Sequence, residues 1–388
     1  MLIGLDGNEA NVKNRVGSNV YAFEILCQLY KLATSYQLPA TRIKFKIYLS
    51  SNPLPDLPKE KLGWEYKILK PKFFWTQWRL PLELCLTKDR PDVFFTPGHY
   101  APRFCPVPSV ISIMDLAFLK YPKSFRQKDL HQLVNWTAYS VKKAAHIFTI
   151  SQYTKKDIVR FYKVPEDKIT VTYPGISKSK KQKVKSKITI QNLKRRYKIY
   201  SDYLIYIGTL QPRKNLTKLI EAFSALSANS AFSAITLVII GKKGWMYDEI
   251  FKLVHRTDLC KRVVFTGYIK EEEKQVLLKS AKAFVLPSLY EGFGIPVVEA
   301  MAAGVPVVIS KVSSLPEIGG KAAIYIKNPK SVTSIAEALI RVLKLTKDQR
   351  KKLIALGLKQ SKKFSWQRAG EKTLEVLKKI GRKNENQR

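Results

Sequence analysis

The sequence is poor in cysteine, and its few cysteines are widely separated. Four are present, and none forms a C-x-x-C pair or lies among histidines: Cys27, Cys85, Cys105 and Cys260. This pattern indicates neither a disulfide framework nor a structural zinc site. Reduced thiols in a cytoplasmic protein are therefore expected. A clustered Asp-x-Asp pattern is missing as well, so no metal ion is expected.

Acidic residues are also scarce. Asp and Glu number 30 against 69 Lys and Arg, which gives a formal net charge of +39. Such a charge predicts attraction to polyanions, whether an anionic membrane surface, nucleic acid or phosphorylated substrates. The lysines are spread along the whole chain, so the excess of positive charge is equally consistent with a general compositional bias of the source organism that serves no dedicated function.

Long apolar runs are the third absence. No uninterrupted stretch approaches the length of a membrane span. Residues 1–10 lack the basic segment and apolar run of a signal peptide. The protein is therefore expected to be soluble or peripheral to a membrane. With 388 residues and 45% hydrophobic content, the chain is long enough for two domains with buried cores.

Residues 287–310 carry the densest functional pattern. The apolar run at residues 283–286 predicts a buried strand, and residues 288–295 form a glycine-containing loop. Pro296 suits the first position of a short helix, because the missing N–H of proline has no helical partner there. Residues 307–309 predict the next buried strand. The loop therefore faces the N-terminus of a helix, where backbone N–H groups favour an anion.

Two carboxylates lie in this unit, Glu291 in the loop and Glu299 in the helix. Carboxylates next to a phosphate-binding helix end are suited to accept hydrogen bonds from hydroxyls, such as those of a sugar and a ribose. Alternatively, Glu291 is a solvated loop charge and Glu299 only complements the helix dipole. Their combination within a glycine-rich loop favours the ligand.

A second anion-binding pattern follows the apolar strand predicted at residues 203–207. The loop GTLQPRKN places Arg213 and Lys214 directly before a helix, for which Asn215 is expected to be the N-cap. Two cations beside free helical N–H groups predict a diphosphate site.

These motifs resemble the signature of family 4 glycosyltransferases (glycosyl transferases group 1). The resemblance is carried by E-G-F-G-x-P-x-x-E-A-M-A-x-G-x-P-V at residues 291–307 and by G-T-L-x-P-R-K-N at residues 208–215. It implies the GT-B fold, in which two doubly wound Rossmann-like α/β domains face a central cleft. It also implies a retaining glycosyltransferase that uses a nucleotide-diphosphate sugar and needs no cofactor or metal.

The resemblance assigns roles to residues of the second half. Glu291 contacts the donor sugar, Arg213 and Lys214 hold the diphosphate as catalytic cations, and Glu299 binds the ribose hydroxyls. Further donor-binding candidates are the backbone positions of the loops: Gly292, Phe293, Gly294, Ile295, Gly208, Gly267 and Tyr268. The P-R-K-N variant resembles mannosyltransferase-like members, so GDP-mannose is favoured as the donor and UDP-glucose follows.

The first half begins with a strand at residues 2–5, a glycine-containing loop and a helix at residues 18–36, as in a doubly wound domain. It lacks G-x-G-x-x-G, so no nicotinamide cofactor is suggested. Acceptor-side candidates are Gly17, His99 and Asp115. Family members show His-Asp-Leu where this chain has Met114-Asp115-Leu116, and methionine cannot donate a hydrogen bond to a sugar hydroxyl. His99 is the nearest candidate to replace that histidine.

Residues 67–86 alternate basic and aromatic side chains: Lys67, Lys70, Lys72, Phe73, Phe74, Trp75, Trp78 and Arg79. This combination suits an anionic membrane interface and would also fit stacking on nucleic-acid bases. A core helix with a basic outer face is an equally good interpretation.

The predicted organisation has four parts: an acceptor-side domain at residues 1–180, a basic linker at 181–200, a nucleotide-sugar-binding domain at 201–365, and a helix at 366–388 that crosses back to the first domain. The expected function is transfer of a hexose, with mannose favoured, to a glycan or lipid-linked acceptor of polysaccharide biosynthesis. The protein is expected in the cytoplasm, either in solution or in peripheral association with the inner face of the cell membrane. Alternatives are a sugar-nucleotide epimerase, a phosphorylase, or a non-catalytic binder of nucleic acid or another polyanion.

Overall fold

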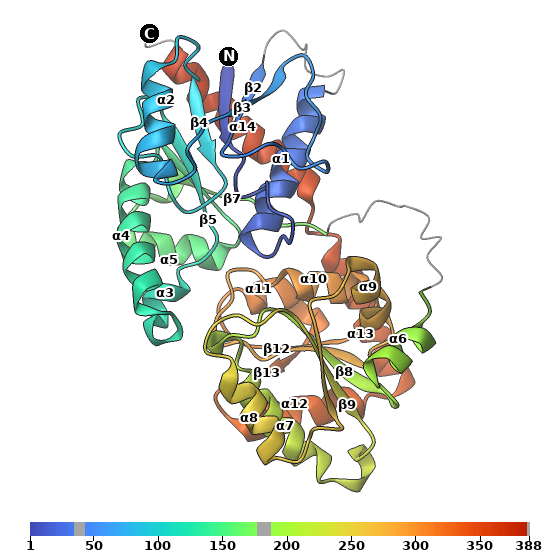
Figure 1. The fold of residues 1–388 in the computed structure, drawn as a ribbon. Coiled ribbons are helices and arrows are strands. Elements are labelled where there is room, and N and C mark those ends of the chain that lie inside the picture. Colours follow the sequence, from blue (N-terminus) through green and yellow to red (C-terminus); the bar gives the residue numbers. More distant parts are fainter. Residues whose placement is uncertain (35–42, 177–187, 386–388) are drawn as a thin grey trace. The chain divides into compact units, whose positions relative to one another are not determined.

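The computed structural model describes residues 1–34, 43–176 and 188–385 (Figure 1). The chain divides into two compact units. Unit 1 comprises Met1–Leu119, Gln127–Ser177 and Ser365–Arg388, and unit 2 comprises Lys120–Arg126 and Lys178–Phe364. Both units are therefore assembled from segments that lie far apart in the sequence.

Unit 1 is built on a seven-stranded parallel sheet with the order β3-β2-β1-β4-β5-β6-β7. Its strands are β1 (Leu2–Asp6), β2 (Lys44–Leu49), β3 (Trp64–Ile68), β4 (Val93–Thr96), β5 (Ser109–Ile113), β6 (His146–Thr149) and β7 (Ile169–Val171). The central strands are apolar and buried along their whole length, as expected where helices cover both faces of a parallel sheet.

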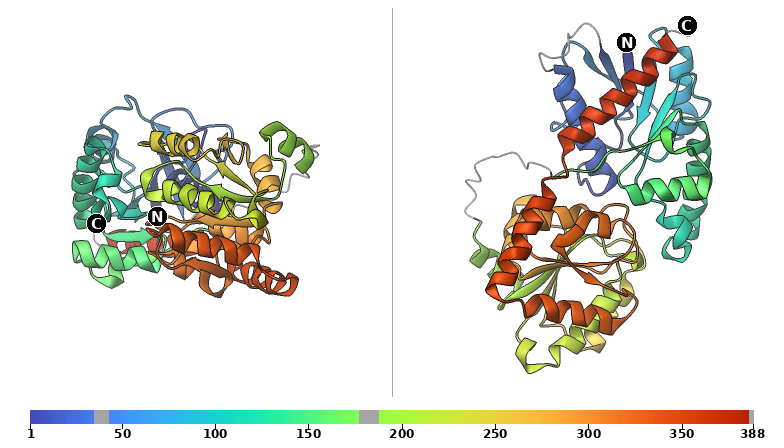
Figure 2. Two further views of the ribbon diagram at one scale, coloured as in Figure 1. Left: turned by 90° about the horizontal axis from the view of Figure 1, so that it is seen from below. Right: turned by 180° about the vertical axis from the view of Figure 1, so that it is seen from behind.

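The helices of unit 1 include the C-terminal one. They are α1 (Ser18–Thr34), α2 (Leu80–Leu86), α3 (Ala117–Lys120), α4 (Gln127–Lys143), α5 (Gln152–Tyr162) and α14 (Trp366–Glu385), with a π-helical turn η1 (Trp75–Arg79) before α2. Figure 2 shows α14 lying along the sheet of unit 1, and it packs on α1, β1 and β4. Trp366 at its start is buried, 5.9 Å from the ring of Tyr21.

Unit 2 contains a six-stranded parallel sheet with the order β10-β9-β8-β11-β12-β13. Its strands are β8 (Tyr203–Ile207), β9 (Thr236–Ile240), β10 (Val263–Gly267), β11 (Ala283–Leu286), β12 (Val307–Ser310) and β13 (Ala323–Ile326). Every residue of β8, β9, β11 and β12 is buried, because these strands form the middle of the sheet. Their continuous apolar runs are typical of strands covered on both faces.

Helices cover this second sheet in two groups. The helices are α6 (Ile190–Tyr197), α7 (Leu216–Ser227), α8 (Asp248–Arg256), α9 (Glu271–Lys279), α10 (Ile295–Ala302), α11 (Leu315–Gly319), α12 (Val332–Leu343) and α13 (Lys347–Ser361). On one face α7 packs against α8 and α12, and on the other α10 packs against α11 and α13 (Figure 1). Because the strands are parallel, the loops that follow β8, β9, β10 and β11 meet at one edge, where α/β folds bind ligands.

The predicted fold class, two doubly wound parallel α/β sheets, is confirmed. The segment predicted as a basic linker was expected to end in a helix, and α6 is that helix; residues 181–187 of the segment fall outside the described part of the chain. The sequence did not predict that residues 120–126 belong to unit 2. This segment is tied to the rest of unit 2 by a hydrogen bond in which Trp245 Nε1 donates to the carbonyl oxygen of Ser124 at 2.6 Å.

Candidate active site

The candidate active site begins where the loops after β8 and β11 are tied together. The side-chain amide of Asn215 donates to the carbonyl oxygens of Pro287 at 3.0 Å and Pro329 at 2.6 Å. Asn215 is the N-cap residue of α7, as expected, but its side chain makes no capping hydrogen bond: its backbone is left-handed, with φ 60°, and its amide points to these loops instead. The backbone N–H of Leu289 also donates to the carbonyl of Arg213 at 2.9 Å.

Glu291 lies at the centre of this site. Its Oε1 accepts from Lys214 Nζ at 2.6 Å and from Ser288 Oγ at 2.6 Å, and its Oε2 is 3.5 Å from Arg213 NH1. The side chains of Glu291, Arg213 and Lys214 are only 8%, 14% and 14% exposed. The structure therefore brings together the three residues that the two motifs predicted as catalytic, although they are separated by nearly 80 positions.

The charge of Glu291 depends on its partners. Burial by itself would raise its pKa, but Lys214, Arg213 and the hydrogen bond from Ser288 outweigh burial and lower the pKa below the ordinary glutamate value. Glu291 is consequently ionised at neutral pH and can only accept hydrogen bonds. The alternative interpretation of Glu291 as a solvated loop charge does not fit its burial.

Two serines of the loop after β12 fix the backbone around Glu291. Ser313 Oγ accepts from the backbone N–H of Glu291 at 2.9 Å. Ser314 Oγ lies 2.8 Å from the carbonyl oxygen of Glu291 and 3.1 Å from that of Phe293. A third loop thus holds the Glu291 segment in place, which is the type of support that a preorganised site requires.

The glycine-rich loop exposes backbone and hides its aromatic side chain. Phe293 is buried, with its ring edge-on to Phe364 at 5.3 Å, so only its backbone can face a ligand. Gly294 has φ 101° and directly precedes α10. The backbone angle at this position favours glycine, and a Cβ there would lie 3.0 Å from Leu315 Cδ2, so that leucine would also have to shift slightly.

Replacing Gly294 with alanine is expected to destabilise the protein more than the same change at Gly267. Both positions have positive φ, which costs about 1–2 kcal/mol for a residue with a side chain. At Gly267 nothing lies within 4 Å of the added Cβ, whereas at Gly294 the contact with Leu315 adds about 1–3 kcal/mol of overpacking. Urea denaturation of both variants measures the difference, and equal losses would contradict the proposed crowding.

Glu299, one turn into α10, has a partner that the sequence did not indicate. Lys274 Nζ lies 3.1 and 3.0 Å from its two carboxylate oxygens and 2.9 Å from Glu271 Oε2. Burial raises the pKa of Glu299, Lys274 lowers it, and the charge of Glu271 raises it, with a net increase. Glu299 is therefore held in position by α9 instead of merely complementing the dipole of α10.

The remaining donor candidates lie at the same edge of the sheet. The N–H of Gly208, after β8, donates to the carbonyl oxygen of Ile240 at 2.9 Å. Gly267 ends β10 beside Ile240, and its carbonyl accepts from the N–H of Gly241 at 3.0 Å. Tyr268, the next residue, is 55% exposed. Ile295 is the first residue of α10 and Gly292 directly follows Glu291.

The acceptor-side candidates belong to unit 1. His99 Nε2 accepts from the backbone N–H of Met114 at 2.9 Å, so the histidine does lie beside the position where the family histidine is expected. Burial lowers the pKa of His99 and Asp115 partly opposes this. Asp115 Oδ1 accepts from the N–H of Ala117 at 3.0 Å, at the start of α3. Gly17, with φ 52°, precedes α1 and has open space around it.

Unit 1 also contains a polar group that the sequence interpretation missed. Asp6, at the carboxyl end of β1, accepts from Trp75 Nε1 at 3.0 Å and from the N–H of Asn8 at 3.0 Å. Burial raises its pKa to about 6. Glu9 nearby accepts from Asn19 at 2.7 Å, and burial raises its pKa as well. In the sequence, Asp6 could have been identified as a site candidate from its position directly after the first predicted strand.

Metal-binding geometry is not found in the described residues. Across residues 1–34, 43–176 and 188–385, no three His, Cys, Asp or Glu side chains gather closely enough to hold a metal ion. The site in unit 2 contains the cations Arg213 and Lys214 beside Glu291, and Glu299 beside Lys274. Such a set can hold a diphosphate through Arg and Lys and hydroxyl groups through Glu.

Two family models match the chain over most of its length. Residues 190–360 match the model described as "Glycosyl transferases group 1", and residues 47–180 match "Glycosyltransferase Family 4". The chain belongs to the family 4 glycosyltransferases. The resemblance expected from the two motifs is thereby confirmed.

Curated relatives include several mannosyltransferases. The chain is 32% identical to O-antigen chain mannosyltransferase B of Escherichia coli over 66% of its own length and 64% of the relative's. It is 29% identical to the serotype-specific mannosyltransferase WbdA of Escherichia coli over 63% of its own length and 29% of the relative's. An uncharacterized glycosyltransferase of Methanocaldococcus jannaschii is 32% identical over 65% of this chain and 63% of that one. The matched region thus spans less than two thirds of each of these relatives.

Solved structures show the same fold. Sucrose-phosphate synthase from Thermosynechococcus elongatus has a TM-score of 0.71 and 17% identity, with 98% of each chain covered. Anabaena HepE, solved in complex with UDP and glucose, has a TM-score of 0.70 and 18% identity, with 97% of this chain and 99% of that chain covered. These similarities confirm the GT-B fold.

Proposed function

We propose that the protein is a retaining glycosyltransferase that moves a hexose from a nucleotide-diphosphate sugar to a glycan or lipid-linked saccharide. The observation that carries this proposal is the buried group of Glu291, Lys214 and Arg213 at the shared edge of β8 and β11. The names of the relatives, all transferases of sugars, support the same class of reaction.

Each charged residue has a separate task in this proposal. Lys214 and Arg213 bind the diphosphate and offset the charge that develops on it as the bond to the sugar breaks, which is the role of preorganised cations. Ionised Glu291 keeps these cations in place and accepts a hydrogen bond from a donor-sugar hydroxyl. Glu299, held by Lys274, accepts from the ribose hydroxyls. No metal or cofactor is needed for this division of tasks.

GDP-mannose is the favoured donor and UDP-glucose the next candidate. GDP-mannose is supported by relatives that are 28–32% identical to this chain and are named mannosyltransferases. UDP-glucose is supported by the more distant HepE, whose structure was solved with that donor. The candidate site itself recognises features that both donors share, a diphosphate and a ribose, so the base must be determined by measurement.

A thermal-shift screen with GDP, UDP, GDP-mannose and UDP-glucose is expected to identify one stabilising pair of nucleotide and sugar nucleotide. A donor at 100 times its Kd adds about 2.7 kcal/mol to the free energy of unfolding, which raises the Tm by roughly 3 °C for a chain of this size. Detection of the transferred sugar on an acceptor then tests the reaction itself.

The same screen separates the alternatives. Stabilisation by a nucleotide sugar that is isomerised without transfer would indicate an epimerase, and sugar phosphate release from a glycan would indicate a phosphorylase. Binding of RNA with no response to any nucleotide would indicate a polyanion binder, which the net charge of +39 and the basic and aromatic residues of the segment 67–86 would suit.

We propose further that unit 1 contacts an anionic membrane surface, on the cytoplasmic side, where a lipid-linked acceptor would be reached. Phe73, Phe74 and Trp78 are 69%, 65% and 72% exposed around η1. Exposed aromatic rings with nearby lysines suit a membrane interface. No described helix is long and apolar enough to cross a membrane.

The inner face of the same segment belongs to the core. Leu80 and Leu84 of α2 are buried against Tyr48 and Phe94. The core-helix interpretation is thus correct for this face. Its expected basic outer face is wrong, because the exposed positions of α2 include Leu82 and Leu86.

A triple change of Phe73, Phe74 and Trp78 to serine is expected to reduce co-sedimentation with phosphatidylglycerol vesicles at least several-fold. The three rings would each bury apolar area worth about 1.5–3 kcal/mol on insertion. Leu62→Ser is the matched control, because Leu62 is 80% exposed and lies outside the aromatic cluster. Equal binding of the triple variant and the wild type would contradict insertion of these rings.

A further inference from the structure

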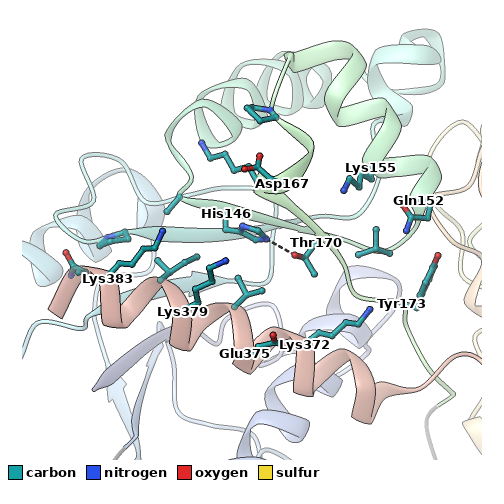
Figure 3. Close-up of a pocket in the computed structure, with 18 residues that line it drawn as sticks. His146, Gln152, Lys155, Asp167, Thr170, Tyr173, Lys372, Glu375, Lys379 and Lys383 are labelled. Atoms are coloured by element: carbon teal, nitrogen blue, oxygen red, sulfur yellow. Dashed lines mark hydrogen bonds between the residues drawn. The ribbon is translucent and has the colours of Figure 1, made fainter. Parts of the chain in front are cut away.

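Unit 1 contains a solvent-open cavity of about 890 Å³ that none of the proposed functions uses. It lies between α14 on one side and β6, β7 and α5 on the other (Figure 3). All of its lining residues belong to unit 1, whereas the candidate donor site belongs to unit 2. We call it the α14 pocket.

The α14 pocket is lined by a surplus of lysines. Five of its residues are lysines and two are carboxylates: Lys155, Lys168, Lys372, Lys379, Lys383, Asp167 and Glu375. Lys155 has a carboxylate partner, Glu166, at 3.8 Å. Among the described residues, the other four lysines form no ion pair, so their ammonium groups are available to an anion.

Three of these lysines form a row on one face of α14. Lys372, Lys379 and Lys383 are separated by seven and four positions, which places them on the same side of an α-helix. With a rise of 1.5 Å per residue, the row is about 16 Å long. Figure 3 shows Lys155 on the opposite wall, so cations border the pocket from both sides. A single phosphate cannot reach all of them.

The interior of the pocket supplies neutral hydrogen-bonding groups. His146 Nε2 lies 2.9 Å from Thr170 Oγ1, in the middle of the view in Figure 3. Burial, followed by the charges of Lys379 and Lys168, lowers the pKa of His146 to about 4. The imidazole is thus neutral at physiological pH, and it experiences the positive potential of the lysines around it.

We propose that the α14 pocket binds an elongated anion that carries at least two phosphate groups. Phosphates along the row meet Lys372, Lys379 and Lys383, while the opposite wall contributes Lys155 and Lys168. The apolar side chains of Val376 and Ile380, which also line the pocket, suit the connecting part of such a ligand. This site is independent of the proposed transfer reaction.

Isothermal titration with inorganic tripolyphosphate at physiological salt tests the proposal on the full chain. The pocket variant Lys372→Gln, Lys379→Gln, Lys383→Gln is expected to weaken binding by about tenfold or more, since each lysine provides a charge-assisted hydrogen bond. A matched control is Lys351→Gln, Lys352→Gln, Lys359→Gln on α13 of unit 2, which removes the same charge from exposed positions.

Vesicles distinguish a soluble ligand from a lipid headgroup. Phosphatidylcholine vesicles with a polyprenyl diphosphate should recruit the wild type but not the pocket variant if the phosphates belong to a lipid. Response to tripolyphosphate without vesicle recruitment would support a soluble ligand. Equal weakening by the pocket variant and the α13 control would overturn the proposal, because binding would then reflect net charge alone. The proposal would also be overturned if neither tripolyphosphate nor the vesicles bound the wild type.

Discussion

Replacing Lys214 with alanine is expected to lower kcat/KM for the sugar donor by roughly 10²–10³, the usual effect of removing one preorganised donor from a developing oxyanion. The proposed diphosphate site loses one of its two cations, and Arg213 NH1 remains 3.5 Å from Glu291 Oε2. The pKa of Glu291 is expected to rise, because Lys214 supplies the largest of the effects that oppose its burial. Steady-state kinetics with the donor identified by the thermal-shift screen measures the effect.

The same substitution should also destabilise the free protein. Removing one partner of a buried ion pair costs about 3 kcal/mol, so the Tm is expected to fall by several degrees. Lys218→Ala, on the neighbouring helix α7, is the matched control. Lys218 is 41% exposed and pairs with Glu221 at the surface, which contributes about 0–1 kcal/mol. Unchanged turnover in Lys214→Ala would remove the basis of the diphosphate assignment.

Replacing Glu299 with glutamine is expected to raise the Kd of the donor about 10–100-fold, because a hydrogen bond to a charged group contributes about 1.5–3 kcal/mol. The value of kcat should change less, since the ribose is remote from the bond that breaks and contributes uniform binding. Calorimetric titration of the donor measures the loss.

A double comparison makes this second prediction specific to the ribose. A 2′-deoxy donor should bind the wild type more weakly but lose little further affinity for Glu299→Gln, because both changes remove the same contact. Glu271→Gln is the control, since Glu271 contacts the same Lys274 but is 48% exposed. Additive losses for the variant and the deoxy donor would show that Glu299 acts elsewhere.

The charged half of the candidate site could be predicted because each motif is local. Arg213 and Lys214 precede one helix, and Glu291 precedes another, so strand and helix patterns alone placed them at the ends of strands. Parallel strands then bring those ends to one edge. The order of the strands, with β8 beside β11, explains why the two motifs meet.

The contacts that support the site could not be predicted in the same way. Lys274 lies on α9, and no feature of that helix distinguishes it from other lysines in a chain with so many. Asn215 is the N-cap residue of α7, but its side-chain amide binds the carbonyl oxygens of two distant loops instead of capping the helix. Hydrogen-bond and ion-pair partners that lie far apart in the sequence are brought together by tertiary packing, which the hydrophobic periodicity of single helices and strands does not describe.

The position of α14 determines the order in which the chain can finish folding. The strands of unit 1 precede unit 2 in the chain, yet Trp366, Leu374 and Leu377 of α14, which follow unit 2, are buried in unit 1. Domains generally fold as units while the chain emerges. Unit 2 lies almost entirely before α14, so its core is complete while unit 1 still exposes the face that α14 covers. The domain that starts first is therefore completed last.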